Sequence, residues 1–153
     1  MKKYILLSLA VSFVILVSLA AKIIYQDTEK KISSFNSSMK YEEKKEYDNA
    51  IQSLLQNYEE NKNDYLFNLR LGWLYYSKRD YSKSKTYYQR AVDIRKNSTE
   101  AMLALTLPVS KLDDWDLVQS IYQKILKIDP NNFYANLYLG QIYLNKTEYS
   151  KAK

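Results

Sequence analysis

The sequence repeats at an interval of 34 residues, and this period constrains the fold more than any other feature. The aromatic residues that recur at this interval are Tyr47, Tyr81, Trp115 and Tyr149. Each follows an acidic residue, and the two glycines of the chain, Gly72 and Gly140, are separated by twice the interval. A fixed period of about 20 to 50 residues is typical of stacked supersecondary units. We therefore expect an array of similar units.

The spacing within one period predicts a pair of helices. One helical face is shared by Leu71, Gly72 and Tyr75. A second helical face starts at Tyr81 and includes the residues three, seven and ten positions after it. Between them lies a polar stretch that ends in Asp80, a side chain suited to accept hydrogen bonds from the free N–H groups at a helix start. With only 2 Gly and 2 Pro, the chain lacks the turn residues of a strand-rich fold.

The sequence resembles tetratricopeptide repeats, which have 34-residue units with Leu, Gly, Tyr, Ala and Pro at characteristic positions. The residues that carry the resemblance are Leu71, Gly72, Tyr75, Tyr88 and Ala91 in one unit, Leu105, Tyr122 and Pro130 in the next, and Leu139, Gly140, Tyr143 and Ala152 in the last. The resemblance implies an all-α fold, an α-solenoid of antiparallel helix hairpins. The units are expected at 31–64 (degenerate), 65–98, 99–132 and 133–153, the last cut short after the start of its second helix.

An apolar segment precedes the repeats. Residues 1–25 begin with Met1 and two lysines and continue with an apolar run from Tyr4 to Ala21, which predicts either a transmembrane anchor or a signal peptide cleaved near Ala20. The leading lysines favour a cytoplasmic N-terminus, with the repeats on the far side of the membrane or secreted after cleavage. Residues 26–30 are expected to form a short linker.

Composition excludes several classes of chemistry. The chain has no Cys and no His, which removes disulfides, thiolate and imidazole metal sites, and Cys–His or Ser–His nucleophile pairs. Three of the 23 basic residues flank the apolar segment, and the remainder carries 20 basic and 17 acidic residues, too balanced for a nucleic-acid surface. We predict no catalytic, cofactor-binding or metal site, no small-molecule substrate and no nucleic-acid partner.

The resemblance also implies a binding surface, because the first helices of successive units line a concave groove in this family. The residues that this phase places in the groove are Leu66, Leu69, Trp73, Tyr76, Leu103, Leu107, Ser110, Tyr134, Leu137, Tyr138 and Gln141. A groove rich in Leu, Tyr and Trp suits an apolar or helical peptide with aromatic anchors. The Lys/Asn pattern with which some family members hold a terminal carboxylate is absent. The same aromatic residues also fit a purely structural role in the core.

These features predict a non-catalytic scaffold or adaptor, tethered to a membrane, that binds partner proteins. Two alternatives remain at this stage. One is a soluble secreted subunit of an envelope assembly, and the other is the N-terminal regulatory part of a longer protein, suggested by the incomplete last unit. Partner identity, repeat number and oligomeric state do not follow from the sequence.

Overall fold

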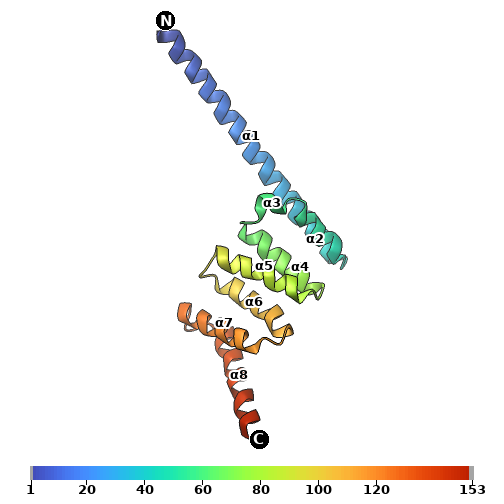
Figure 1. Ribbon diagram of the computed structural model, residues 1–153. Coiled ribbons are helices and arrows are strands. Elements are labelled where there is room, and N and C mark those ends of the chain that lie inside the picture. The colour runs from blue at the N-terminus through green and yellow to red at the C-terminus, as the bar shows by residue number, and fades with distance from the viewer. Residues whose placement is uncertain (1, 152–153) are drawn as a thin grey trace.

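The computed structural model describes the chain from residue 2 to residue 151, and the side chains of residues 12–145 and 147. This part is all-α and contains no strand, as predicted. In Figure 1 one long helix projects from a stack of shorter helices, and the two ends of the chain lie at opposite ends of the molecule. The helices are α1 (Lys2–Glu43), α2 (Tyr47–Leu55), α3 (Tyr58–Asn61), α4 (Tyr65–Ser77), α5 (Tyr81–Ile94), α6 (Thr99–Lys111), α7 (Trp115–Ile128) and α8 (Phe133–Lys151).

The helices follow the 34-residue period at both of their alternating start points. Helices α2, α5 and α7 begin at the repeated aromatic residue, and α4, α6 and α8 begin 34 residues apart in turn. The predicted cap of α5 is confirmed, because the Asp80 carboxylate accepts a hydrogen bond from the Lys83 N–H at 3.1 Å. Residues at three further positions of equal spacing, Asp64, Ser98 and Asn132, cap α4, α6 and α8 in the same way.

The turn inside each hairpin contains a residue in the left-handed helical conformation. These residues are Lys45, Arg79 and Asp113, with φ of 59°, 68° and 58°, and they too are 34 residues apart. After α4, the Asp80 N–H bonds to the Tyr75 carbonyl at 2.9 Å across this residue, which is the six-to-one bond of a Schellman motif. Glycine is the usual residue at this position, because a Cβ makes the conformation unfavourable.

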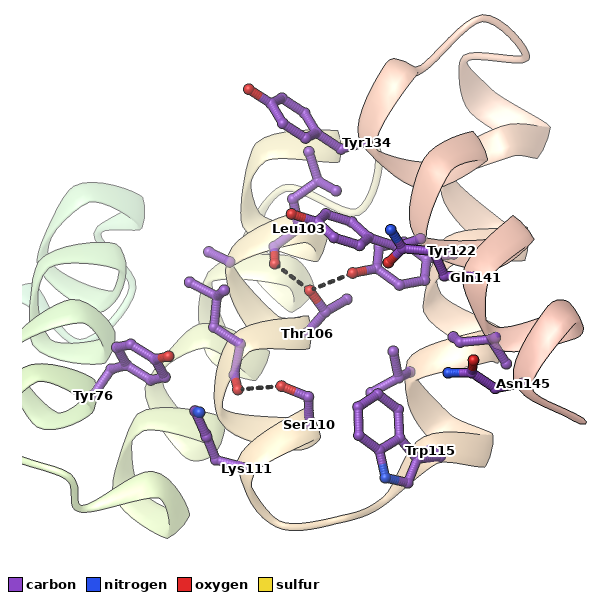
Figure 2. A pocket seen from close by; sticks show the side chains of 15 residues that line it. Tyr76, Leu103, Thr106, Ser110, Lys111, Trp115, Tyr122, Tyr134, Gln141 and Asn145 are labelled. Atoms are coloured by element: carbon purple, nitrogen blue, oxygen red, sulfur yellow. Dashed lines mark hydrogen bonds between the residues drawn. The ribbon is translucent and has the colours of Figure 1, made fainter. Parts of the chain in front are cut away.

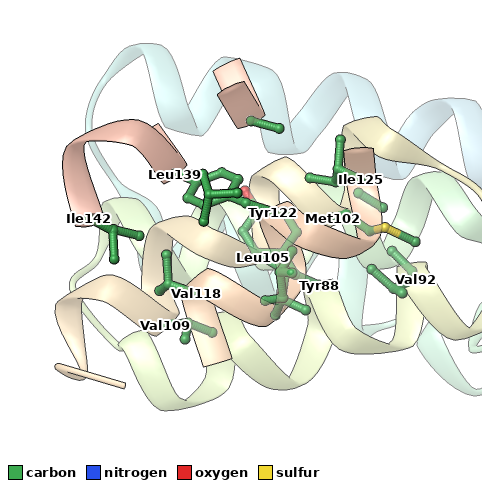
Figure 3. Close-up of a cluster of buried hydrophobic side chains, with 14 of the residues drawn as sticks. Tyr88, Val92, Met102, Leu105, Val109, Val118, Tyr122, Ile125, Leu139 and Ile142 are labelled. Carbon is green, nitrogen blue, oxygen red and sulfur yellow. The ribbon is translucent and has the colours of Figure 1, made fainter. Parts of the chain in front are cut away.

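The core forms where neighbouring helices cover one another. Figure 3 shows the larger cluster, in which Tyr88 and Val92 of α5 meet Leu105 of α6 and Tyr122 of α7. A second cluster joins α2 and α4 around Leu54 and the fully buried Phe67 and Leu71.

Helices α4 and α5 are in close contact at Gly72. A Cβ on Gly72 would lie 2.6 Å from the Tyr88 ring, and the Ser84 hydroxyl donates to the Gly72 carbonyl at 2.8 Å. At Gly140, by contrast, a Cβ would meet no atom within 4 Å. The two glycines at matching phases of the period therefore have different surroundings.

The C-terminal part of α1 belongs to the helical stack. Its side chains make four successive contacts with α4. The first is an ion pair of 3.0 Å between Lys31 and Asp64, the residue that caps α4. The ring of Phe35 then packs edge-on against that of Phe67, with 4.9 Å between centroids. The next two contacts are hydrogen bonds, donated by Arg70 to Ser38 and by Trp73 to Glu42. Residues 26–30, expected as a linker, lie within this unbroken helix.

The membrane prediction is wrong. No helix in the described part of the chain has a stretch long and apolar enough to cross a membrane. The first part of the predicted run lies outside the described side chains. We withdraw the single-pass localisation, together with its alternative of release after cleavage near Ala20, through which α1 continues as helix.

The last helix also departs from the period. The repeat predicts a turn before Tyr149, but α8 continues as one helix to Lys151. A second helix becomes stable mainly by packing its apolar face on a neighbour. Thr147, at the phase of Arg79 and Asp113, is helical and is not among the residues with a positive φ, so the turn is not formed and the helix from Phe133 continues.

Replacing Gly72 by Ala should destabilise the protein. A methyl group that overlaps the face of the Tyr88 ring forces the two helices apart, at a cost of about 1–3 kcal/mol that exceeds the gain in helix propensity. Gly140→Ala is the matched control, and we expect it to be neutral or stabilising by up to about 1 kcal/mol. Urea unfolding followed by circular dichroism measures both, and equal effects of the two substitutions would contradict this account.

Replacing Arg79 by Gly should stabilise the protein by about 0.5–1 kcal/mol, because glycine adopts a φ of 68° without the steric cost that a side chain brings. The neighbouring Lys78 has an ordinary helical φ of −73°, so Lys78→Gly should destabilise by a similar amount. Thermal unfolding of the two variants compares them directly. A lower unfolding temperature for Arg79→Gly than for the wild-type protein would refute the strain argument.

Candidate peptide-binding groove

A pocket of about 640 Å³ lies between helices α4, α6, α7 and α8. Tyr76 of α4 and Lys111 of α6 lie on one side of it, and Trp115 of α7 and Asn145 of α8 lie on the other (Figure 2). Helix α6 forms the floor between them, with Leu103 and Leu107 one helical turn apart. Four helices therefore contribute to one concavity.

Aromatic rings form one wall of the pocket. Tyr134 and Tyr138 stack with 6.5 Å between ring centroids, and Tyr138 stacks on Tyr122 of α7 at 5.8 Å. Offset stacking of this kind stabilises a pair by about 0.5–1.5 kcal/mol beyond the area that it buries. The wall is consequently apolar, with ring edges and hydroxyl groups available at its surface.

The polar groups of the pocket fall into two sets. Thr106 and Ser110 use their hydroxyl groups within the protein, donating to the carbonyls of Leu103 and Leu107 at 2.7 and 2.8 Å. Tyr122 in turn donates to Thr106 at 3.3 Å. The second set consists of Gln141, Asn145 and Lys111, whose side chains have no hydrogen-bond or ion-pair partner among the described residues. These three are available to a ligand.

The structure places the residues expected in the groove in two groups. Seven of them line the pocket together: Tyr76, Leu103, Leu107, Ser110, Tyr134, Tyr138 and Gln141. Leu66, Leu69, Trp73 and Leu137 do not line it. Leu69 packs against the larger core cluster, and Leu66 and Leu137 are exposed. Trp73 is 42% exposed, stacks on Tyr76, and donates its indole N–H to Glu42 of α1.

Sequence reasoning missed the contribution of the second helices. Trp115, Val118 and Tyr122 of α7 line the pocket, as do Lys111 and Asn145 at its edges. In the resemblance to the family, the groove is formed by the first helix of each repeat. Trp115 and Tyr122 lie in the second helix of their repeat and were therefore interpreted as packing residues. The available signal was Trp115 itself, the only Trp among the repeated aromatic positions and half exposed in the structure.

Lys111 is the single charged side chain among the described residues that line the pocket, and no cluster of carboxylates able to hold a metal ion occurs in the described part of the chain. Burial raises the pKa of Tyr122, and the neighbouring Tyr138 acts in the same direction, while the hydrogen bond to Thr106 opposes them. The phenol of Tyr122 therefore stays neutral when free tyrosines ionise.

The raised pKa of Tyr122 makes a prediction for alkaline stability. A folded-state pKa above the unfolded value favours folding below about pH 10, and this contribution is lost as the pH rises further. The wild-type protein should thus exceed Tyr122→Phe in stability by up to about 1 kcal/mol at pH 8, and this difference should shrink at pH 11. Urea unfolding at the two pH values tests the change, and a constant difference would contradict the assignment.

Comparison with known proteins identifies the repeats. Models of the tetratricopeptide repeat family match residues 67–98 and 121–153. No sequence among the curated proteins matches the chain.

Solved structures share the fold at low sequence identity. The first TPR of Spaghetti (RPAP3) bound to the HSP90 peptide SRMEEVD has a TM-score of 0.68 and 18% identity, over 78% of this chain and 94% of that one. The second TPR domain of human RPAP3, in complex with the HSP70 peptide SGPTIEEVD, has a TM-score of 0.67 and 14% identity, over 76% and 98%. The MamA protein has a TM-score of 0.70 and 20% identity, over 82% and 68%. With two models of this family matched on a solenoid of the same period, the chain contains tetratricopeptide repeats at residues 67–98 and 121–153.

Proposed function

We propose that this protein is a non-catalytic adaptor that binds a peptide segment of a partner protein in the pocket between α4, α6, α7 and α8. The observation that carries the proposal is the pocket itself, a concavity of about 640 Å³ lined by Leu and Tyr side chains, with unengaged amide groups at its edge. Concave, mostly apolar sites with a few polar groups are the usual form of binding sites.

The comparisons support a peptide as the ligand class. Two of the similar structures are complexes with short peptides, from HSP90 and from HSP70. Tetratricopeptide repeats are a protein-interaction fold, and the same scaffold serves different partners through different side chains. The identity of the partner therefore depends on the chemistry of this pocket.

We assign the binding surface to the groove residues predicted from the sequence, with the pocket at its centre. Leu103, Leu107 and Tyr138 provide apolar contact, and Gln141 supplies hydrogen bonds to a peptide backbone. Tyr76 extends the surface towards Trp73, on which it stacks at 6.2 Å between centroids. Leu66, Leu69 and Leu137 lie along the same helices beyond the pocket and form the rest of the proposed groove.

Substituting two pocket residues should abolish partner capture. In the full-length chain carrying Leu107→Ala and Tyr138→Ala, in-cell crosslinking should lose the partners that the wild-type protein captures, because truncating a central contact typically weakens binding by ten-fold or more. Leu112→Ala with Ile128→Ala is the matched control, since these side chains are exposed to a similar extent but line no part of the pocket.

Both double variants should retain the helical circular dichroism of the wild-type protein, so that a loss of capture reports on the groove. Capture that survives the Leu107 and Tyr138 substitutions would place the interface elsewhere on the molecule. Capture lost equally in the control variant would show a general effect on the surface.

A further inference from the structure

We infer that the pocket recognises an internal, apolar peptide segment that carries a single carboxylate, and that this carboxylate pairs with Lys111. The inference rests on the proposed function and specifies its ligand. It distinguishes this chain from the similar structures, whose bound peptides end in Glu-Glu-Val-Asp.

The charge of the pocket carries the argument. Among the described residues, its lining contains one cation, Lys111, and no carboxylate; the other described side chains of the lining are uncharged. Lys111 stands in the last turn of α6, where it has no ion-pair partner among the described residues. A charged group that leaves water needs an opposite charge or several hydrogen bonds to offset its desolvation. The pocket can therefore compensate one carboxylate.

An acidic C-terminal peptide is a poor match for this surface. The peptide SRMEEVD brings three acidic side chains and, as a chain end, a terminal carboxylate. Three of these four negative charges would meet only tyrosine rings, leucine side chains and uncharged amides in this pocket. Complementary charge fixes specificity at interfaces, and uncompensated charge is penalised. The pocket therefore excludes such a peptide.

The described acidic residues of the neighbouring turn form no ion pair with Lys111. Asp114 accepts a hydrogen bond from the Leu117 N–H at 3.3 Å as the cap of α7, and its carboxylate lies 3.4 Å from Lys85. Asp113 and Asp116 are exposed and are not part of the lining. In Figure 2 the Lys111 side chain lies on the Tyr76 side of the pocket, away from Trp115, where α7 begins.

The rest of the lining defines the other half of the ligand. The floor and aromatic wall, with Leu103, Leu107 and Tyr138, suit aliphatic or aromatic side chains. Gln141 and Asn145 carry both donors and acceptors and can bind peptide N–H and C=O groups without regard to sequence. Apolar side-chain contacts and backbone hydrogen bonds can both be made to the interior of a peptide. Binding of this kind does not require the C-terminus of the peptide.

Two random ten-residue peptide libraries on beads test the inference, one with free carboxyl termini and one with amidated termini. Each is incubated with the labelled full-length protein, and bound peptides are sequenced. We expect equal recovery from both libraries, with enrichment of Leu, Phe and Trp and of one Asp or Glu per peptide. Synthetic SRMEEVD should bind at least ten-fold more weakly than the enriched peptides.

A charge-exchange cycle then assigns Lys111. Changing the enriched acid to its amide should weaken binding about two- to five-fold, as expected for a solvent-accessible ion pair. Lys111→Gln should weaken the acidic peptide to the same extent and leave the amide peptide unchanged. Lys124→Gln, on an exposed part of α7 outside the pocket, should have no effect.

The outcomes separate this inference from the proposed function. Enrichment of polyacidic peptides or of free acidic termini would overturn the inference while supporting peptide binding. An acid preference unchanged in Lys111→Gln would overturn the assignment of Lys111. Recovery no greater than that of the variant with Leu107→Ala and Tyr138→Ala would overturn the proposed function and the inference with it.

Discussion

Burial of each helix against its neighbour is the constraint on which the structure depends, since no helix here can cover its own apolar residues. The central hairpin satisfies it twice. Tyr65 of α4 and Tyr88 of α5 belong to the larger core cluster, whereas Phe67 and Leu71 of α4 belong to the cluster shared with α2. The bare backbone of Gly72 lets the Tyr88 ring lie against α4. The hairpin thus connects the two cores into one solenoid.

The period in the sequence was sufficient to predict the helix pairs, because aromatic and small residues at fixed phases can be buried only by regular stacking. It was insufficient for features that depend on the backbone or on neighbouring units. The left-handed residues Lys45 and Arg79 gave no signal, since Lys and Arg are not typical of that conformation. Trp115 and Tyr122 were missed as pocket residues because the pocket that they line depends on how α8 is placed beside α7. Residues 26–30 were predicted to be a linker because they separate the apolar segment from the first unit, yet they continue a solvent-exposed helix.

The similar structures show how little the fold determines the ligand. At 14–20% identity they share the path of the backbone, while the side chains that face the groove are free to differ. In this chain the described side chains of the pocket are mainly tyrosine, leucine and uncharged amides, and Lys111 is the one cation among them. Specificity in such proteins is a property of the grafted surface, and it has to be derived from the residues present.

Helix α1 sets the geometry between its N-terminal part and the groove. Its end is clamped to α4 through Lys31, Phe35, Ser38 and Glu42, and the helix continues without a break towards Ser12. At 1.5 Å per residue, the part from Ser12 to Lys31 is a rod of about 28 Å. A flexible tether of equal length would let the groove face any direction. Because this helix is continuous, it is a rigid spacer. The orientation of its end near Ser12 therefore fixes the orientation of the groove.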